Sequence, residues 1–360
     1  MNDILAKIKP EIRALRAYTL SPDRATVKIN QNESPWDAPA RIKAETLRRL
    51  ETRQWSRYPD FVSLSLNQRL AEFSGWKSDG IITGNGSNEL IQAVLMVTVA
   101  PGSRVLISEP TFALYRQIST VLGGEVISVP LMPELTYDLN ALQRAVSDLK
   151  PDVTIICSPN NPTGCVLSDE GLRTLLESNS GLLVIDEAYH EFAGHTVVPL
   201  LSAHENAIVL RTFSKAMALA GLRAGYLLAA PQLVREIRKA VLPYNLNGFS
   251  QTAAEVAIDL YQDELLPLVS RSIAERRRLF DELSLIEGLR PVPSQANFML
   301  VRSALNPKEV FSELLRRDIL VRDVSGYPML QDYFRLSVGT PTENDLLLKN
   351  LREILMSDKL

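Results

Sequence analysis

The sequence is poor in the residues that build disulfide frameworks and metal sites. It contains two cysteines and three histidines among 360 residues. Cys157 and Cys165 are too few for a disulfide framework, so we expect a reducing, cytoplasmic compartment. His190 and His195 stand five positions apart instead of the four that the zinc-protease helix motif requires. They would not share a helix face, and we expect no metal.

Strong charge and long apolar runs are also missing. The net charge is −3, so nucleic acid is not an expected partner. No apolar run approaches the length of a membrane span, and residues 1–10 lack the apolar stretch of a signal peptide. The remaining composition, with 46% hydrophobic and 22% charged residues, is typical of a globular protein. A chain of 360 residues favours two domains that share a cleft.

Strand and helix patterns alternate over the first two thirds of the chain. Apolar runs of strand length and helical patterns follow one another at 105–107, 111–122, 126–129, 139–149, 153–156, 168–178 and 182–185. This alternation predicts an α/β fold with a mostly parallel central sheet and helices on both faces. Residues 285–360 mix strand candidates at 297–301, 320–322 and 334–338 with helical patterns, which predicts a smaller α+β domain.

We therefore expect three parts along the chain. Residues 1–35 contain too few apolar residues to fold alone and form an N-terminal arm. Residues 36–245 form a large domain, and residues 246–360 form a linking helix and the small C-terminal domain.

A glycine-rich turn between a strand and a helix predicts an anion site. The strand 81–83 leads into the turn 84–89 (Gly-Asn-Gly-Ser-Asn-Glu), and the apolar helix 90–99 follows directly. Glycines let the backbone approach a ligand, and the free N–H groups at a helix N-terminus attract phosphate. A dinucleotide-binding turn is an alternative, with Glu109 resembling its ribose-binding acid. However, Glu89 occupies the third glycine position of that motif, where a carboxylate would lie near the pyrophosphate.

Lys215 lies in a polar turn after the apolar run 207–210 and has no acidic neighbour in sequence. Arg223 follows eight residues later. Its positive charge would lower the pKa of the lysine, which favours a nucleophilic amine, and it could also hold a phosphate. A lone Ser-Lys pair would favour an ordinary solvated lysine, so the interpretation depends on the other motifs.

Polar side chains cluster where predicted strands end. Residues 158–164 follow the strand 153–156, and residues 186–189 follow the strand 182–185. Ligands of parallel sheets bind beyond the carboxyl ends of the strands. In isolation, Asp186 would be a helix N-cap, Asn161 a turn former, and Tyr115 and Tyr189 packing residues. Those separate interpretations do not explain why all of these residues lie at strand ends.

Together these groups match what pyridoxal 5′-phosphate requires. An amine (Lys215) forms a Schiff base with its aldehyde, and a carboxylate (Asp186) keeps its pyridine nitrogen protonated. Tyr189 and Asn161 are donors for its phenolate oxygen, Tyr115 supplies a ring above it, and the glycine turn with Ser214 and Arg223 supplies a phosphate cradle.

In order and spacing, these motifs resemble the fold-type I, aspartate-aminotransferase-like pyridoxal-phosphate enzymes, and within them the branch that acts on histidinol phosphate. The resemblance covers nearly the whole chain. It rests on residues 28–35, 57–60, 84–90, 160–164, 186–189, 214–225, 243–245, 293–298 and 335–340.

The resemblance implies a role for each matching residue. Lys215 would hold the cofactor and move a proton, Asp186 would pair with the pyridine nitrogen, and Tyr189 and Asn161 would donate to the phenolate oxygen. Tyr115 would stack on the ring. The implied phosphate ligands are Gly86, Ser87, Asn88, Thr212, Ser214 and Arg223, together with Tyr58 of the neighbouring subunit, which requires a homodimer.

Arg335 stands at the position that binds a substrate carboxylate in most members of the family. Histidinol phosphate has no carboxylate, and the resemblance implies that Arg335 binds its phosphate instead. The residues implied to help are Tyr18, Asn32, Tyr244 and Arg322. Trp36 and residues 216–218 depart from the commonest pattern and bear on substrate preference.

The implied reaction is amino transfer from L-histidinol phosphate to 2-oxoglutarate in histidine biosynthesis, which gives imidazole-acetol phosphate and L-glutamate. An aromatic amino-acid aminotransferase and a threonine-phosphate decarboxylase of cobalamin biosynthesis are alternatives with the same cofactor. A non-enzymatic ligand sensor is a further alternative. Such sensors carry a fused DNA-binding domain, which we do not expect because the arm begins at the first residues.

Overall fold

The computed structural model describes residues 4–15, 17 and 22–357. Within this part of the chain the α-helices are α1 (Pro10–Ala14), α2 (Ala40–Glu51), α3 (Leu64–Ser74), α4 (Ser87–Thr98), α5 (Leu114–Leu122), α6 (Leu139–Leu149), α7 (Asp169–Ser178), α8 (His190–Ala193), α9 (Pro231–Ile237), α10 (Gly248–Asp259), α11 (Leu266–Ser284), α12 (Pro307–Arg316) and α13 (Pro341–Ser357). None of the helices described is both long and apolar enough to cross a membrane.

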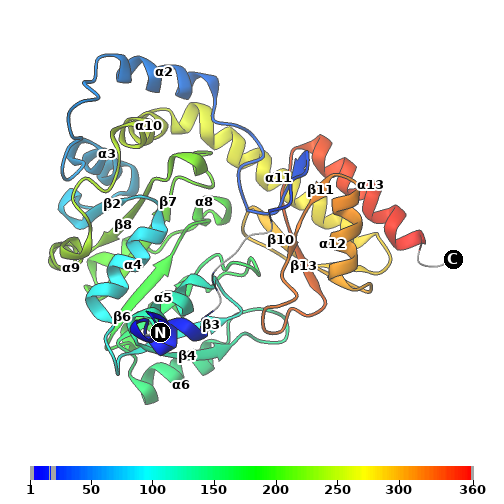
Figure 1. Ribbon diagram of the computed structural model, residues 1–360, viewed down its shortest axis with the longest axis horizontal. Coiled ribbons are helices and arrows are strands. Elements are labelled where there is room, and N and C mark those ends of the chain that lie inside the picture. Colours follow the sequence, from blue (N-terminus) through cyan, green and yellow to red (C-terminus); the bar gives the residue numbers. More distant parts are fainter. Residues whose placement is uncertain (1–3, 16, 18–21, 358–360) are drawn as a thin grey trace.

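A seven-stranded sheet forms the centre of the larger part of the molecule (Figure 1). Its strands, in spatial order, are β2 (Ile81–Gly84), β8 (Gly225–Ala229), β7 (Ala207–Thr212), β6 (Leu182–Asp186), β5 (Val153–Cys157), β3 (Arg104–Glu109) and β4 (Glu125–Pro130). From β7 to β4 all neighbours are parallel, whereas β8 is antiparallel to both β7 and β2. The prediction of a mostly parallel sheet is therefore confirmed, with one reversed strand.

The central strands are apolar on both sides because helices cover both faces of the sheet. Successive residues of a strand point to opposite faces. On one face lie Val105, Ile107, Val153, Ile155, Val184, Ile208 and Leu210, which pack against α4, α5 and α9. On the other face lie Leu106, Ile156, Leu183, Ile185 and Val209, which pack against α6, α7 and α10. The sheet edge at the carboxyl ends of β5, β6 and β7 is thereby fixed between two helical layers.

A smaller unit lies beside this sheet, at the far end of the long helix α11 (Figure 1). Its four-stranded sheet has the order β12 (Arg322–Asp323), β13 (Tyr333–Ser337), β10 (Phe298–Ser303) and β9 (Leu289–Pro291). A short parallel pair joins β1 (Val27–Lys28) to β11 (Ile319–Leu320), so a segment of the predicted arm pairs with this unit. The limits predicted near residues 35 and 245 stay predictions.

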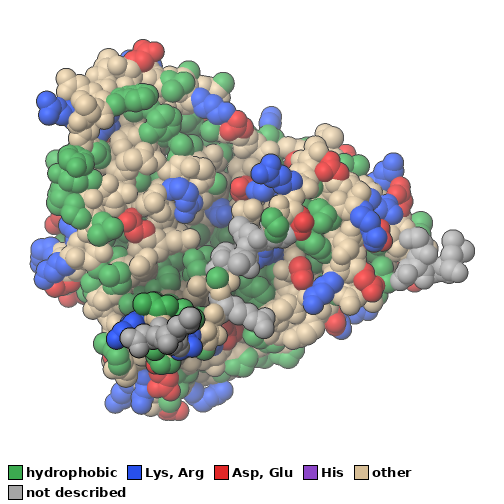
Figure 2. Space-filling view, viewed as in Figure 1, with side chains coloured by type: hydrophobic (Ala, Val, Ile, Leu, Met, Phe, Trp, Pro, Cys, Tyr) green, Lys and Arg blue, Asp and Glu red, His purple; other side chains and the backbone are tan. Residues whose placement is uncertain are grey.

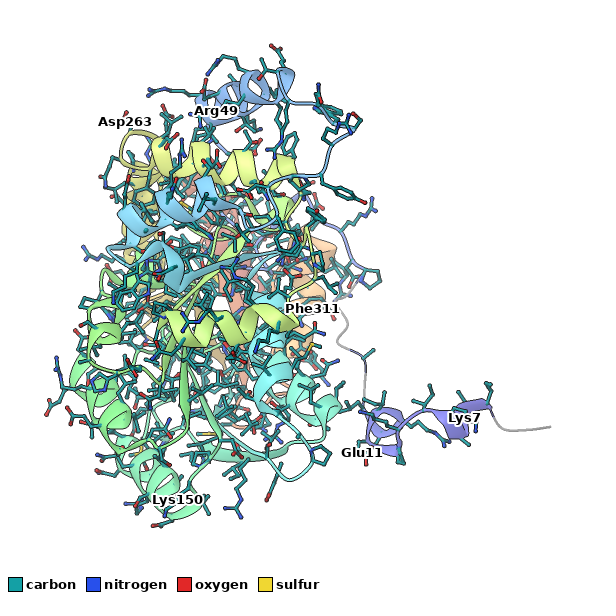
Figure 3. All side chains as sticks on the ribbon, turned by 90° about the vertical axis from the view of Figure 1, so that its left-hand side faces the viewer. Lys7, Glu11, Arg49, Lys150, Asp263 and Phe311 are labelled. Atoms are coloured by element: carbon teal, nitrogen blue, oxygen red, sulfur yellow. The ribbon has the colours of Figure 1, made fainter. Side chains whose placement is uncertain are left out.

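The first helical segments project from the main body, which they touch where α1 contacts α5. In the side view of Figure 3, Lys7 and Glu11 stand outside the main body, and Ile4, Leu5 and Ile8 are exposed. On the face drawn in Figure 2, Lys and Arg side chains are interspersed with Asp and Glu side chains. That mixture agrees with the small net charge of the sequence.

Candidate active site

A cleft of about 470 Å³ lies at the carboxyl ends of β5, β6 and β7. Most of the residues selected from the sequence come together around it, although they are spread over the whole chain. Those that line the cleft are Asn32, Ser87, Asn88, Asn161, Asp186, Tyr189, Thr212, Ser214, Lys215, Arg223, Arg322 and Arg335. Residues at the edge of the seven-stranded sheet line one part of the cleft, and Arg322 and Arg335 of the small unit line another.

The Lys215 amine is partly buried in this cleft. Its Nζ donates a 3.0 Å hydrogen bond to the carbonyl of Gln31, and it lies 5.8 Å from the centre of the Tyr189 ring. Burial, followed by the positive charge of Arg335 and a smaller effect of Arg223, lowers the pKa of Lys215 to about 7. A substantial fraction of the amine is therefore neutral near pH 7, as a nucleophile requires.

The Asp186 carboxylate ends β6 and is buried. Its Oδ2 accepts a 2.7 Å hydrogen bond from the Tyr115 hydroxyl, and its Oδ1 accepts one of 3.0 Å from the Ala188 N–H. Burial raises the pKa of Asp186, and these two donors act in the opposite direction. A cationic ligand group in the cleft would therefore find a fixed, weakly solvated carboxylate as its partner.

An anion cradle lies at the start of α4. This helix has Gly86 as its N-cap and no side-chain cap, in contrast to α6 and α7, which Asp138 and Ser168 cap. Gly86 has φ +82°, and a Cβ at this position would lie 2.4 Å from Nη2 of Arg223. Uncapped N–H groups at a helix N-terminus and a nearby guanidinium bind phosphate well.

Arg223 and Ser214 complete the cradle from the loop after β7. Nη1 of Arg223 donates to Oγ of Ser214 at 3.2 Å, and Oγ1 of Thr212 donates to the same oxygen at 3.0 Å. Two hydroxyls and a guanidinium thus stand together beside the helix N-terminus.

The Tyr189 phenol is held by a polar network. Nδ2 of Asn32 donates a 3.1 Å hydrogen bond to its hydroxyl oxygen, and Ser337 binds both the backbone N–H and Oδ1 of Asn32. Burial raises the pKa of Tyr189, which keeps the phenol protonated and able to donate. Asn32 has φ +55°, a conformation that asparagine tolerates better than most residues.

Two arginines of the small unit face the cleft from neighbouring strands. Arg322 of β12 and Arg335 of β13 are register partners in the antiparallel pair. Nη2 of Arg335 donates to the carbonyl of Asn30 at 2.8 Å, and Nη1 donates to Oδ1 of Asn161 at 2.5 Å. This pair of guanidinium groups is suited to bind a second anion, apart from the cradle at α4.

The comparisons with known proteins agree with this geometry. A family model described as aminotransferase class I and II matches residues 24–351. The chain belongs to this family. Histidinol-phosphate aminotransferase of Chlorobium phaeobacteroides is 40% identical to this aminotransferase over 354 residues, which is 98% of each chain.

Solved structures share the fold of this aminotransferase. Histidinol-phosphate aminotransferase from Sinorhizobium meliloti, in complex with pyridoxal 5′-phosphate, has a TM-score of 0.88 at 26% identity, covering 98% of both chains. L-threonine-O-3-phosphate decarboxylase from Porphyromonas gingivalis has a TM-score of 0.80 at 23% identity, covering 92% of this chain and 99% of its own. The second likeness is one of fold alone.

The role predicted for Tyr115 in this aminotransferase is corrected by the structure. The side chain was expected to stack on a ligand in the cleft, but it is 0% exposed and does not line the cleft. Its hydroxyl reaches Asp186 from the covered face of the sheet. Phe112, which was not among the expected site residues, lines the cleft instead. Its position in the loop after β3, at the same sheet edge as Asp186, was the signal that could have identified it.

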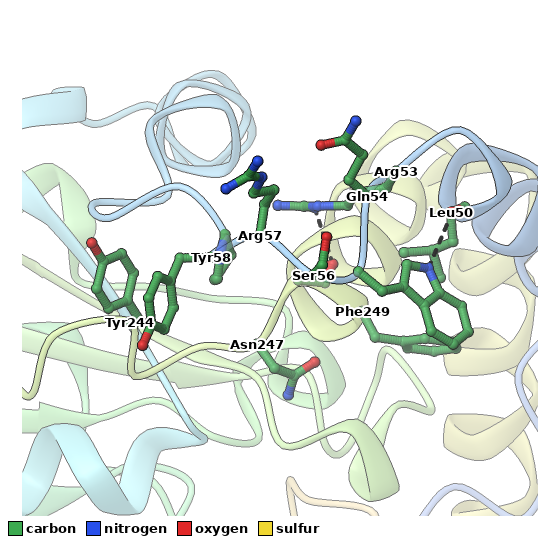
Figure 4. A pocket seen from close by; sticks show the side chains of 12 residues that line it. Leu50, Arg53, Gln54, Ser56, Arg57, Tyr58, Tyr244, Asn247 and Phe249 are labelled. Carbon is green, nitrogen blue, oxygen red and sulfur yellow. Dashed lines mark hydrogen bonds between the residues drawn. The ribbon is translucent and has the colours of Figure 1, made fainter.

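Tyr58 and Tyr244 of the aminotransferase lie outside the cleft formed by their own chain. Their rings stack with centres 4.4 Å apart, and both line a surface pocket with Trp55, Arg57 and Phe249 (Figure 4). The prediction that Tyr244 contacts substrate is therefore not met within one chain. Tyr58 was predicted to serve a neighbouring subunit, and its outward position leaves that prediction untested. Tyr18 lies outside the described residues.

Proposed function

We propose that this aminotransferase binds pyridoxal 5′-phosphate through Lys215 and transfers the amino group of L-histidinol phosphate to 2-oxoglutarate. One observation supports the cofactor proposal most strongly. A lysine with a pKa of about 7 lies in the same cleft as a buried carboxylate and an uncapped helix N-terminus. The cofactor supplies an aldehyde for the amine and an electron-withdrawing ring.

The residues of the cleft fit this cofactor, and each chemical group of the cofactor has a matching side chain. Gly86, Ser87 and Asn88 would bind its phosphate together with Ser214 and Arg223. Asp186 would hold its pyridine nitrogen in the protonated form. Tyr189 and Asn161 would donate to its phenolate oxygen. Lys215 would then serve as the base that moves the substrate proton, since burial and nearby positive charge lower the pKa of its amine to about 7.

The substrate proposal rests on the two arginines and on the relatives. Arg322 and Arg335 are adjacent across β12 and β13, and they suit a phosphate ester at the end of the cleft away from α4. The similar protein from Chlorobium phaeobacteroides bears the name of a histidinol-phosphate aminotransferase. The same arginines would take the carboxylate of 2-oxoglutarate in the second half of the reaction.

Steady-state assays with two amino compounds test the substrate proposal. We expect glutamate formation from histidinol phosphate with a kcat/KM roughly 100-fold above that for phenylalanine, which carries a carboxylate but no phosphate ester for the two arginines. Arg322→Gln should reduce the ratio of kcat/KM for histidinol phosphate to kcat/KM for phenylalanine. Arg302→Gln, which removes an exposed arginine paired with Asp332, should leave this ratio unchanged. A higher kcat/KM for phenylalanine would overturn the substrate proposal.

A threonine-phosphate decarboxylase is the second candidate, because phosphothreonine is also an amine with a phosphate ester and the fold is shared. Release of carbon dioxide from phosphothreonine, without glutamate formation, would favour it over amino transfer.

We further propose a homodimer in which Tyr58 contacts the cofactor phosphate of the partner subunit. Tyr58 is 80% exposed and Trp55 is 81% exposed, and both border an open pocket of about 570 Å³ (Figure 4). Large exposed aromatic side chains that gather around one pocket are typical of a protein interface. The cytoplasmic compartment expected from the cysteines stays a prediction.

A further inference from the structure

Tyr115 connects the cleft to the covered face of the central sheet. It lies in the first turn of α5, a helix that packs on β3 and β4 and belongs to the layer covering one face of the central sheet. In the register of the parallel strands β5 and β6, Cys157 is the partner of Asp186, so both side chains point to that same face. Tyr115 and Cys157 belong to the same cluster on that face, and the Tyr115 hydroxyl reaches Asp186 at the end of β6.

The contacts of Tyr115 are specific. Its hydroxyl donates a 2.7 Å hydrogen bond to Oδ2 of Asp186, and the Ala188 N–H donates one of 3.0 Å to Oδ1. Each carboxylate oxygen thus has one donor, which fixes the plane of the group. The Tyr115 ring also meets the cleft-lining Phe112 edge to face, with ring centres 5.6 Å apart and an angle of 83° between the rings.

We propose that Tyr115 is a positioning residue for Asp186: its hydroxyl holds the carboxylate in the orientation and charge state needed to keep the pyridine nitrogen of the cofactor protonated. This inference rests on the proposed function, because it concerns the same cofactor. Tyr115 itself does not line the cleft, so it acts through Asp186.

The charge argument explains why such a donor is needed. Burial raises the pKa of Asp186, and the negative charge of Glu187 raises it further. The Tyr115 hydrogen bond is the largest influence that lowers the pKa of Asp186, followed by the Ala188 N–H and the charge of Lys215.

The other titratable groups around Asp186 are each held in place. Glu187 forms a buried ion pair with Arg211 at 2.8 Å, and Sγ of Cys157 donates to the carbonyl of Pro159 at 3.3 Å. The Tyr189 hydroxyl accepts a hydrogen bond from Nδ2 of Asn32. Tyr115 is therefore the side chain whose removal changes the ionisation of Asp186 most directly.

Replacement of one hydroxyl tests this proposal. In Tyr115→Phe, we expect the affinity of the apoenzyme for pyridoxal 5′-phosphate to fall roughly 10-fold, since a hydrogen bond to a charged group is lost. The pH at which the visible band of the bound cofactor changes should also shift, and kcat should fall more than KM rises. Tyr137→Phe is the matched control, because the Tyr137 hydroxyl donates 2.5 Å to the carbonyl of Cys157 and does not touch Asp186.

A cofactor analogue separates positioning from a general structural effect. In 1-deazapyridoxal 5′-phosphate a carbon atom replaces the pyridine nitrogen, so Asp186 has no partner. Wild type and Tyr115→Phe should bind this analogue with equal affinity. The proposal would be overturned if Tyr115→Phe lost as much affinity for the analogue as for pyridoxal 5′-phosphate, or if Tyr137→Phe lost as much cofactor affinity as Tyr115→Phe. An unchanged cofactor affinity and pH profile in Tyr115→Phe would also overturn it. Failure of the wild-type apoenzyme to bind pyridoxal 5′-phosphate would instead refute the proposed function.

Discussion

Nη1 of Arg335 donates a 2.5 Å hydrogen bond to Oδ1 of Asn161, across 174 positions of sequence. The arginine proposed to bind the substrate anion thus contacts the amide proposed to bind the cofactor. Because Oδ1 of Asn161 is occupied, its amide nitrogen is directed elsewhere and can donate to the phenolate oxygen. The small unit and the large sheet are therefore coupled through one side-chain pair within the cleft.

This coupling predicts non-additive kinetics. Asn161→Ala and Arg335→Lys should each lower kcat/KM for histidinol phosphate, because each removes a contact to a ligand and the contact between the two residues. The double variant should lose less than the product of the two single effects, with a coupling free energy of about 1 kcal/mol or more. A double-mutant cycle measures this energy, and strictly additive effects would contradict the coupling.

The Gly86 conformation predicts a selective loss of cofactor affinity. In Gly86→Ala the residue would keep φ near +82° and its Cβ would displace Arg223, so we expect both lower stability and at least roughly 10-fold weaker cofactor binding. Gly75→Ala is the control. Gly75 has φ +70° but open space around it, so this variant should lose about 1–2 kcal/mol of stability without loss of affinity. Equal affinities in the two variants would argue against the cradle.

The pKa of Lys215 predicts how cofactor attachment depends on pH. Only the neutral amine reacts, and the pKa of about 7 means that the neutral fraction rises as the pH increases through 7. The rate at which the visible band appears on mixing apoenzyme with cofactor should therefore rise roughly 10-fold from pH 6 to pH 8 and then level off. The same rate measured in parallel with Nα-acetyl-lysine corrects for the ionisation of the free cofactor. A rate that keeps rising towards pH 10 would mean that the amine is not perturbed.

Arg335→Gln offers a second check on that pKa. The positive charge of Arg335 is the largest charge effect on the pKa of Lys215. Its removal should move the midpoint of the profile to higher pH.

The proposed role of Tyr58 predicts complementation between two defective chains. Lys215→Ala is expected to be inactive, and Tyr58→Phe should bind the cofactor roughly 10-fold more weakly, since it lacks a hydrogen bond to phosphate. A hybrid dimer contains one site with both defects and one intact site. At low cofactor concentration, activity should therefore rise when the two variants are unfolded and refolded together. If the refolded mixture shows only the mean activity of the two separate variants, Tyr58 acts at the site of its own subunit or at neither site.

The residues at strand ends could be predicted because the strands themselves are clear in the sequence. β5 and β6 are mostly apolar runs of strand length, so the positions of Asn161 and Asp186 at one sheet edge followed from the parallel arrangement. Lys215 followed in the same way from β7. Side-chain contacts between the two units, such as that of Arg335 with Asn161, leave no trace in local patterns.

The error at Tyr115 came from the start of one helix. The helical pattern predicted a beginning at Thr111, whereas α5 begins at Leu114. Phe112 therefore belongs to the loop at the edge of the sheet, and Tyr115 packs onto the sheet. The reversal of β8 was also missed. Between β7 and β8 there is only the short 3₁₀ turn Ala220–Leu222, and a parallel strand would have needed a longer crossover helix.

The central claim is that Lys215 carries amino transfer from histidinol phosphate, and one spectrum tests it most directly. Histidinol phosphate is added to the cofactor-loaded protein without any keto acid, and the visible absorption band is followed. We predict that the band disappears while imidazole-acetol phosphate forms in an amount equal to the enzyme, and that Lys215→Ala slows this step roughly 1000-fold or more. A band that persists with histidinol phosphate but disappears with phenylalanine or phosphothreonine would contradict the claim.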